Sequence, residues 1–452
     1  MHMFVRGSTV LLLIGDLIVF TGSLVLTLFV RYQAWPSHDL VSTHLRAFTV
    51  LFVFWVLTFL ITGLYDRYIS LVRKSIPALV LKVQFFNILL AALIFFIFPF
   101  GIEPKTNLVI YLLISTLLIV LWRLYVYPLI ATGKPMRALV VGDSDEALAI
   151  ARMFQGNPFF RNIKPFLLRK KDISDFDEFR ASLLRFVDQG SADMVIADMR
   201  DEFANRLTRD FYKLAFENSN IRFFNLPAIY EHLYHRVPPE LVEESWLLEN
   251  VSAGSPHYAY DVLKRGIDLA GAIALLVPAL VLFPVIMLAI YLEDRGAFFY
   301  EAERVGQFNR PIRILKFRTM TGRDASGDAL KSTLTITKVG TFLRKTRLDE
   351  LPQLLNILMG DLSFIGPRPE IPSLVSVYAE NIPYYNMRHL TKPGLSGWAQ
   401  INNFDVPRGG VDIPRTIDKL SFDLYYLKHR SLILDIEIAL KTINTLVLRS
   451  GT

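Results

Sequence analysis

The sequence predicts a membrane bundle of four α-helices, an α/β Rossmann-like domain, and a second α/β unit that carries a re-entrant membrane helix hairpin. Three observations predict this fold class. Apolar runs of spanning length fill the first 125 residues, strands alternate with helices after residue 136, and a further apolar block covers 266–292. A chain of 452 residues has room for two to four domains of roughly 100–200 residues each. We expect domain boundaries at 1–130, 131–250 and 260–452.

Four apolar runs in the N-terminal part are each long enough to cross a bilayer. They are 8–30, 47–65, 77–100 and 107–125, and a spanning helix needs about 20 apolar residues. The first run is longer than the core of a signal peptide, and no small-residue cleavage site follows it, so we expect it to span. Two ionisable residues, Asp16 and Lys82, lie inside or near these runs. A polar contact within the bundle is one interpretation, and helix packing or snorkelling is the favoured one.

Basic residues predict the side of the membrane that each loop faces, because positive charge marks the cytosolic side. They follow the second and fourth runs at Arg67, Arg73, Lys74, Arg123, Lys134 and Arg137. This bias places the N-terminus, the 66–76 loop and everything after residue 126 in the cytosol. Two arginines in the loop 31–46 reduce the contrast between the two sides.

The composition narrows the class of partner. The net charge is +7, 52% of the residues are hydrophobic, and the sequence holds no cysteine and 8 histidines. Disulfides and thiolate metal sites are therefore excluded, and the histidines lack the paired spacing of a zinc site. A basic chain suits anionic lipid head groups or phosphorylated substrates. Nucleic acid is not an expected partner, because no basic amphipathic run suited to its backbone is present.

The middle domain is predicted from strands that alternate with a helix. Strands are expected at 137–142, 194–197 and 221–224, with a helix over 203–218, a pattern typical of a parallel α/β sheet. The turn Gly142-x-Ser144-x-x-Ala147 lacks two of the three glycines of a dinucleotide fingerprint, including the one that lets backbone approach a pyrophosphate. A structural or regulatory role is therefore favoured over a cofactor site.

The apolar block 266–292 is long enough to span a membrane by itself. Pro278 and Pro284 lie in its middle, and each removes a backbone donor and clashes with the carbonyl four residues earlier. Basic residues precede the block and a mixture of acids and a base follows it, which fits both ends on the cytosolic face. We favour a bent re-entrant hairpin that breaks near the two prolines. A kinked spanning helix is the alternative.

Polar motifs in the C-terminal part contain the candidate site residues. The string KFRTM places Lys316 and Arg318 at the end of an alternating stretch, either as a phosphate clamp or as a solvated strand edge. In GPRPE, Pro367 and Pro369 flank Arg368, which indicates a rigid loop against a base or phosphate, or a simple turn. Further along, KPGLSGWAQ ends at Gln400, and a later string, SFDLYY, adds one more acid at Asp423.

An acid pair follows three cations in RKTRLDELPQL. Pro352 is tolerated only in the first turn of a helix, so we expect a helix that begins near Asp349 and ends at Gly360. The positive helix N-terminus and nearby cations such as Arg344 predict a lowered pKa for the carboxylates, suited to a nucleophile or metal ligand. An ordinary N-cap with surface charges is the alternative, and for this motif alone it is favoured.

Taken together and in order, KFRTM, LDELPQL, GDLSFIGPRPE, KPGLSGWAQ and FDLYY resemble the bacterial sugar transferase family, the monotopic phosphoglycosyl transferases. The resemblance covers the catalytic domain from Lys264 through Thr442. The four spans and the Rossmann-like domain resemble the large members, the polyprenyl-phosphate hexose-1-phosphate transferases. The stretch after Ile382 looks closest to members tied to exopolysaccharide export.

The resemblance implies a two-step reaction at the bacterial inner (cytoplasmic) membrane, with the catalytic domain on the cytosolic face. Asp349 would attack the sugar-bearing phosphate of a UDP-sugar and release UMP, and the phosphosugar would pass to undecaprenyl phosphate. Glu350 would deprotonate or position the lipid phosphate, and Mg²⁺ would bind at Asp349. The residues expected to contact substrate or phosphate are Lys316, Arg318, Arg344, Arg368, Pro367, Pro369, Gln400 and Asp423.

In one respect the sequence departs from the family. The re-entrant helix of the family often breaks at a Ser-Pro pair, and the aligned pair here is Leu280-Val281, bracketed by Pro278 and Pro284. The family also implies a lipid bilayer as a partner and a homodimer for large members. Glucose and galactose are family-typical sugars, and nothing in the sequence selects one. A scaffold with a decayed site, and a middle domain that modifies sugars with NAD, are the competing hypotheses.

Overall fold

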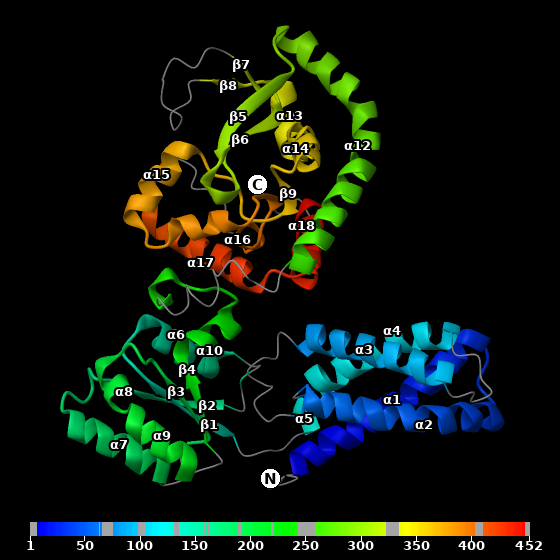
Figure 1. The fold of residues 1–452 in the computed structure, drawn as a ribbon, viewed down its shortest axis with the longest axis vertical. Helices are drawn as coiled ribbons and strands as arrows, with labels where there is room; N and C mark the ends of the chain where they lie inside the picture. Colours follow the sequence, from blue (N-terminus) through cyan, green and yellow to red (C-terminus); the bar gives the residue numbers. More distant parts are fainter. Residues whose placement is uncertain are drawn as a thin grey trace. The chain divides into compact units, whose positions relative to one another are not determined.

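The structure is a computed structural model, and it describes residues 7–62, 64–65, 76–97, 105–130, 135–157, 160, 163–188, 192–217, 221–242, 258–321, 334–402 and 410–447. The chain divides into two compact units, Met1–Leu233 and Tyr234–Thr452. Each unit is described by itself, and Figure 1 gives the element labels.

Long apolar helices form a bundle in the first unit. Their bounds are α1 Gly7–Tyr32, α2 His38–Ile61, α3 Ile76–Ile97 and α4 Lys105–Leu121, followed by a π-helical turn, η2, at Trp122–Val126 and by α5 Tyr127–Ile130. By length and composition, four stretches of these helices could each cross a membrane. The number that does cross one stays a prediction.

The second helix begins earlier than its apolar run predicts. It was expected to start at Ala47, but α2 starts at His38, because the side chain of Ser37 accepts a hydrogen bond from the backbone N–H of Leu40 at 3.3 Å and caps the first turn. A polar first turn thus extends the helix beyond its apolar part. Residues 66–75 of the predicted cytosolic loop lie outside the described residues.

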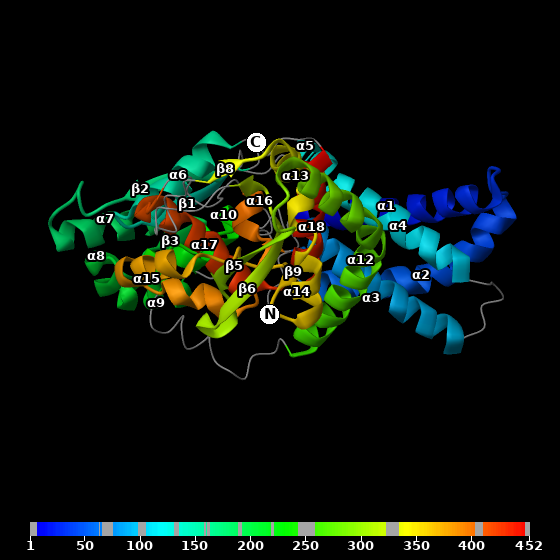
Figure 2. The same ribbon diagram turned by 90° about the horizontal axis from the view of Figure 1, so that it is seen from above.

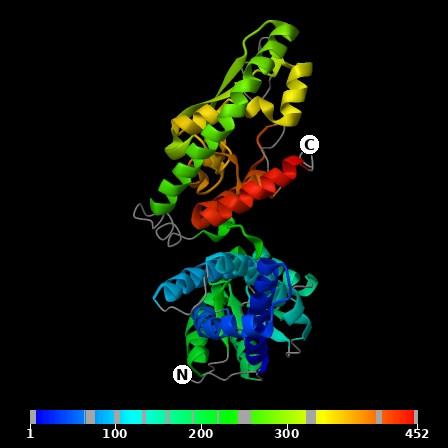
Figure 3. The same cartoon turned by 90° about the vertical axis from the view of Figure 1, so that its right-hand side faces the viewer.

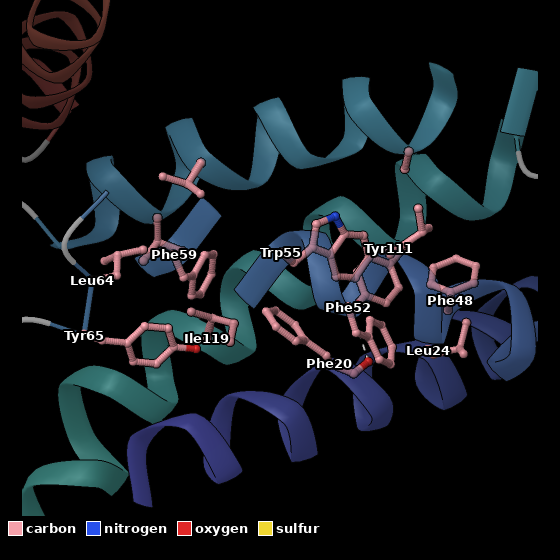
Figure 4. Close-up of a cluster of buried hydrophobic side chains, with 14 of the residues drawn as sticks. Phe20, Leu24, Phe48, Phe52, Trp55, Phe59, Leu64, Tyr65, Tyr111 and Ile119 are labelled. Atoms are coloured by element: carbon pink, nitrogen blue, oxygen red, sulfur yellow. Dashed lines mark hydrogen bonds between the residues drawn. The ribbon is translucent and has the colours of Figure 1, made fainter. Parts of the chain in front are cut away.

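Aromatic rings fill the middle of the bundle between α1, α2 and α4 (Figure 4). Phe20, Phe48, Trp55 and Tyr111 are almost completely buried there. The favoured interpretation of Asp16 as a packing residue is wrong, because its carboxylate forms a buried ion pair with Arg123 of η2. A charge in an apolar bundle is retained only when it is paired, and the apolar pattern of the sequence cannot show the partner.

The predicted middle domain, which is the C-terminal part of the first unit, contains a four-stranded parallel sheet with the strand order β2-β1-β3-β4. Its elements are β1 Met136–Val141, α6 Asp145–Gly156, β2 Ile163–Leu168, α7 Phe176–Asp188, β3 Met194–Ala197, α8 Glu202–Arg206, α9 Thr208–Glu217, β4 Arg222–Asn225 and α10 Leu226–Tyr234. The sequence did not predict β2, which contains Pro165 and lies at the edge of the sheet, where a missing donor is tolerated. The single helix expected over 203–218 is two helices separated at Leu207.

The turn after β1 is closed by its neighbours. Gly142 has a φ of +142°, and a Cβ on it would lie 2.8 Å from the Cβ of Asp198, which follows β3. Asp198 is buried and pairs with Arg200 at 2.7 Å. The side chain of Ser144 accepts a hydrogen bond from the backbone N–H of Ala147 and caps α6. The glycine at this turn thus serves close packing against Asp198.

The second unit combines helices with short pairs of strands. Its elements are η4 Pro239–Leu241, α12 Tyr258–Asp294, β5 Phe299–Val305, η5 Gln307–Asn309, β6 Pro311–Phe317, β7 Met320–Thr321, β8 Thr335–Ile336, α13 Lys338–Thr346, η6 Leu348–Glu350, α14 Gln353–Met359, β9 Ser363–Ile365, α15 Pro372–Asn381, η7 Tyr385–Leu390, β10 Gly394–Ser396, α16 Trp398–Ile401, α17 Ile413–His429 and α18 Leu432–Val447. The antiparallel β5–β6 ribbon is seen from above in Figure 2. β9 and β10 pair in parallel.

The predicted helix hairpin is wrong. Residues 258–294 form one helix of 37 residues that contains both Pro278 and Pro284 (Figures 1 and 3). Each proline removes one backbone donor, which bends a helix but does not reverse its direction. The chain therefore continues through both positions.

One face of α12 packs along the second unit over most of its length. Ala272 and Ala279 contact the cluster that contains Leu354 and Ile357 of α14, and Ile286 packs with Phe317 of β6. Most apolar side chains on the other face are exposed, including those of Ile273, Val277, Val281, Val285 and Leu288. The side of a bilayer that each end of α12 faces stays a prediction.

Candidate active site

The acid pair lies in a tight turn between two helices. Helix α13 ends at Thr346 and is capped by Arg347, whose backbone is left-handed with a φ of 58°. The 3₁₀ turn η6 then carries Asp349 and Glu350. The predicted helix begins later than expected, at Gln353, with Pro352 as its N-cap, and it ends as predicted at Gly360. The backbone N–H of Glu350 donates to the carbonyl of Arg347 at 3.2 Å, which holds the turn.

Glu350 is held by cations. The ammonium of Lys316, from β6, donates to Glu350 Oε1 at 2.9 Å, and Arg368 Nη2 lies 3.8 Å from the same oxygen. Burial raises the pKa of Glu350, but Lys316, Arg368 and Arg347 outweigh burial and leave the pKa below its usual value. Glu350 is therefore ionised at neutral pH, and two residues predicted from separate motifs meet at its carboxylate.

Asp349 differs from its neighbour. Its side chain is 8% exposed, and its Oδ1 atom is buried without a hydrogen bond from any described residue. Burial raises the pKa of Asp349, and the charge of Glu350 adds to this, against the opposing effect of Lys316 and Arg344. The expected lowering of the pKa is therefore wrong for Asp349 and right for Glu350. The difference arises because burial, which a sequence does not show, exceeds the effect of the cations at Asp349.

The other two cations of the motifs have separate partners. Arg344 Nε donates to the hydroxyl of Thr319 at 2.9 Å, and so joins α13 to the KFRTM string. Arg318 forms an ion pair with Asp294, at the end of α12. This placement does not support the prediction that Arg318 contacts phosphate, because its guanidinium pairs with an acid of α12.

The Pro-Arg-Pro loop is supported from beneath by a buried charge network. Arg388 is almost fully buried, donates to the backbone carbonyl of Arg368 at 3.1 Å, and pairs with Asp423 at 2.8 Å. Glu370 pairs with Arg388 at 3.4 Å and with Lys419. The structure places Asp423 in this network, where its carboxylate is 2% exposed and pairs with Arg388, and this placement gives the predicted substrate contact no support.

The loop residues are further tied to the KPGLSGWAQ string. The backbone N–H of Gly394 donates to the carbonyl of Pro367 at 3.0 Å, and that of Gly366 donates to the carbonyl of Ser396 at 2.8 Å. Pro369 lies half-buried in the same loop. Gln400, in α16, donates to the carbonyl of Leu395 at 3.5 Å. No contact among the described residues links Gln400 to the acid pair.

Sequence reasoning missed four charged residues of this region, namely Arg304, Glu370, Arg388 and Lys419. Burial lowers the pKa of Arg304, and the charge of Arg368 lowers it further. Arg304 lies on the same face of β5 as the buried Ala302, and a charged residue at an inward position is a signal that the strand alternation offers. The other three lie in helices or turns, where no such alternation marks them.

The carboxylate oxygens of the acid pair are possible ligands for Mg²⁺. No cluster of three or more acids or histidines suited to a metal occurs in the described part of the chain. Mg²⁺ usually takes one or two carboxylates and completes its shell with substrate phosphates and water. The unpartnered Oδ1 atom of Asp349 is such a donor, so the residues fit a metal that arrives with a phosphorylated substrate.

Comparison with known proteins shows which family the second unit resembles. The sequence profile of the family described as Bacterial sugar transferase matches residues 259–449. A UDP-N-acetylgalactosamine-undecaprenyl-phosphate N-acetylgalactosaminephosphotransferase of Aeromonas hydrophila is 38% identical over 57% of this chain and 60% of its own length. An uncharacterized sugar transferase, EpsL, of Bacillus subtilis (strain 168) is 37% identical over 42% of this chain and 90% of its own length. A UDP-glucose:undecaprenyl-phosphate glucose-1-phosphate transferase of Escherichia coli (strain K12) is 37% identical over 40% of this chain and 39% of its own length.

Proposed function

Since the chain belongs to the bacterial sugar transferase family, as its motifs predict, we propose that it transfers a hexose 1-phosphate from a UDP-sugar to undecaprenyl phosphate. The products are undecaprenyl-diphosphate-sugar and UMP. The observation that supports this proposal best is the acid pair, in which a buried, unpartnered Asp349 lies next to a Glu350 held by Lys316 and Arg368. The relatives from Aeromonas hydrophila and Escherichia coli, which are named as transferases acting on undecaprenyl phosphate, support the same reaction class.

In the proposed first step, a carboxylate oxygen of Asp349 attacks the phosphorus that bears the sugar. The bond between that phosphorus and the bridging oxygen of the diphosphate breaks, and UMP leaves with the electron pair. In the second step, a phosphate oxygen of the lipid attacks the same phosphorus and releases Asp349. A covalent intermediate divides one displacement into two easier ones. An oxygen that accepts no hydrogen bond retains its lone pairs for this attack.

The surrounding charges have proposed roles that follow from their positions. Lys316 and Arg368 now bind Glu350, and they are the natural donors to phosphate oxygens of either substrate. Glu350, ionised because its pKa is lowered, can accept a proton from the lipid phosphate or position it. Asp349 would hold Mg²⁺ in the presence of substrate, and the metal would supply charge neutralisation on the phosphates.

We propose the cytoplasmic membrane of a bacterium as the location, with the catalytic unit on the cytosolic face. The exposed apolar face of α12 and the apolar helices of the N-terminal bundle support a membrane setting. The competing hypothesis of a scaffold with a decayed site gains no support from the acid pair, whose charged partners are all in place. As an enzyme of this kind, the chain would begin the assembly of exopolysaccharide or another glycan.

The first step can be tested without the lipid. The purified full chain is incubated with a panel of UDP-sugars labelled with ³²P on the sugar-bearing phosphate, and UMP and protein-bound label are measured. We expect UMP and covalent label for at least one sugar, and a loss of at least about a thousandfold in the rate of UMP release for Asp349→Asn. The panel also identifies the sugar.

A matched variant separates chemistry from general charge effects. Glu301→Gln removes an acid on β5 that is 60% exposed and pairs with Arg313 at 3.8 Å, so it should release UMP at the wild-type rate. If Asp349→Asn releases UMP as fast as the wild-type protein, the nucleophile is another residue. If no sugar of the panel yields UMP with the wild-type protein, the scaffold hypothesis takes the place of the enzyme.

A further inference from the structure

A cavity of ≈ 250 Å³ lies at the first turns of α12 and is lined by more cations than acids. The cations are Lys264, Arg265, Lys392 and Arg430, and the acids are Asp261 and Asp268. The cavity has no assigned role in the proposed reaction. The side chains that line the cavity therefore carry a net positive charge.

Two of the cations and one acid are already engaged. Lys264 pairs with Asp435 of α18 at 2.7 Å. Arg265 donates to the carbonyls of Ile357 and Leu358 at 2.6 and 2.9 Å, and so caps the C-terminus of α14. The carboxylate of Asp268 accepts from the hydroxyl of Ser363 at 3.1 Å. The charge of Arg265 is therefore matched by neutral carbonyls and by no acid.

Lys392 and Arg430 each have a hydrogen-bond donor that no described residue accepts. Lys392 forms no ion pair or hydrogen bond with any described residue, and the Nε atom of Arg430 is buried without a partner there, although its Nη1 atom lies 3.3 Å from Asp261. A Cβ on Gly360 would lie 3.5 Å from Arg265 Nη2 and 3.7 Å from Lys392 Nζ, so these two cations lie within about twice that distance. Like charges this close repel unless an anion lies between them. The unpaired donors therefore indicate an anionic ligand, and Arg and Lys together favour a phosphate.

Exposed apolar side chains on the first turns of α12 distinguish a lipid phosphate from a soluble one. Val262, Leu263 and Ile267 belong to the same turns as the cavity-lining Lys264 and Arg265, do not line the cavity themselves, and are each more than half exposed. On α18, Ile436 follows Asp435 and is 58% exposed. A soluble phosphate gains nothing from exposed apolar side chains near its site, whereas the acyl chains of a lipid would cover them. Basic residues where a membrane helix begins are typical of binding to anionic lipids.

The cavity is separate from the acid pair. Arg265 binds the carbonyls at the C-terminal end of α14, whereas Asp349 and Glu350 precede its N-terminal end. We propose that this cavity binds the phosphate group of an anionic membrane phospholipid, and that the bound lipid anchors the start of α12 without taking part in the reaction.

The test is the thermal stability of the full chain in neutral detergent during titration with short-chain phosphatidylglycerol. Parallel titrations use short-chain phosphatidylcholine, inorganic phosphate and UMP. A ligand that binds the folded state raises the midpoint of unfolding in a saturable way. We expect a saturable rise with phosphatidylglycerol and a smaller one with phosphatidylcholine. Lys392→Met should need about fivefold more phosphatidylglycerol for half of the effect.

Control variants make each outcome decisive. Lys213→Met removes one positive charge from α9, where the side chain of Lys213 is 72% exposed, and this variant should titrate like the wild-type protein. Arg430→Gln should weaken the lipid effect as Lys392→Met does. The proposal is overturned if both variants titrate like the wild-type protein, or if the wild-type protein does not distinguish phosphatidylglycerol from phosphatidylcholine. It is also overturned if inorganic phosphate or UMP gives the same Lys392-dependent rise, because the ligand is then soluble.

Discussion

The buried charge network beneath the Pro-Arg-Pro loop allows a quantitative prediction for Asp423→Asn. Arg388, Asp423, Glu370 and Lys419 are each no more than 3% exposed in their side chains. Two cations face two acids, so the network is neutral. The substitution keeps the shape of residue 423 and leaves two cations against one acid.

The magnitude follows from the cost of a buried charge that has lost its partner. Removal of one member of a buried ion pair costs about 3–5 kcal/mol. In a unit of the size of Tyr234–Thr452, each kcal/mol lowers the unfolding midpoint by roughly 2–4 °C. Asp423→Asn should therefore lower the midpoint by about 6–20 °C. Because Arg388 also donates to the carbonyl of Arg368, the substitution should slow UMP release as well.

The assay is thermal unfolding of the purified full chain, followed by tryptophan fluorescence, with UMP release measured well below the midpoint. Asp418→Asn is the matched control. Asp418 lies on the same helix, α17, its side chain is 52% exposed, and it pairs with Arg236 at 3.2 Å, a class of pair that contributes about 0–1 kcal/mol. Equal midpoints for the two variants would refute the reasoning that Asp423 balances a buried charge.

Two further predictions concern the acid pair and the membrane helix. Lys316 lowers the pKa of Asp349, so Lys316→Met should raise that pKa and reduce the ionised fraction of Asp349 at a given pH. The acidic limb of the pH profile of kcat/KM for UMP release should therefore move to higher pH. A limb that does not move would contradict the role of Asp349. The sequence holds no cysteine, so a single cysteine placed by Tyr258→Cys or by Arg295→Cys reports the two ends of α12, and a membrane-impermeant thiol reagent should label both from the same side. Labelling of the two from opposite sides would establish a span.

The sequence motifs singled out Asp349, Glu350 and the cations Lys316 and Arg368. In the motifs of the acid pair and of Arg368, prolines or glycines near the charged residues restrict the local backbone. The predicted end of the helix at Gly360 is confirmed, whereas its start lies at Gln353, after Pro352, so Glu350 precedes the helix. The family resemblance gave Lys316 and Arg368 as contacts to phosphate or nucleotide, and it did not predict that they meet at Glu350. The sequence spacing of these residues does not show that they contact one carboxylate.

Burial and distant partners account for the errors. Asp423 was expected at the substrate and lies instead in the buried network, because its partner Arg388 is 35 positions earlier on another element, and nothing in either local string indicates the pair. The pKa of Asp349 is set by burial against several elements, so the local cations predicted the wrong direction. Asp16 and Arg123 are 107 positions apart, and their pairing likewise depends on tertiary structure.

The packing of α12 constrains how the catalytic unit can meet a membrane. Leu351, the residue after Glu350, and Phe283 of α12 pack against the same two hydrophobic clusters. A helix of 37 residues is about 55 Å long, whereas the hydrocarbon core is about 30 Å thick. If α12 crossed the bilayer along its normal, its middle would carry Lys316 and Glu350 to the depth of the hydrocarbon, where charged side chains are costly. A helix that lies close to the membrane plane, with its exposed apolar face in the lipid, keeps those charges at the level of the phosphate groups. The continuous helix therefore favours the surface arrangement expected of a hairpin, because the catalytic unit packs along one side of it.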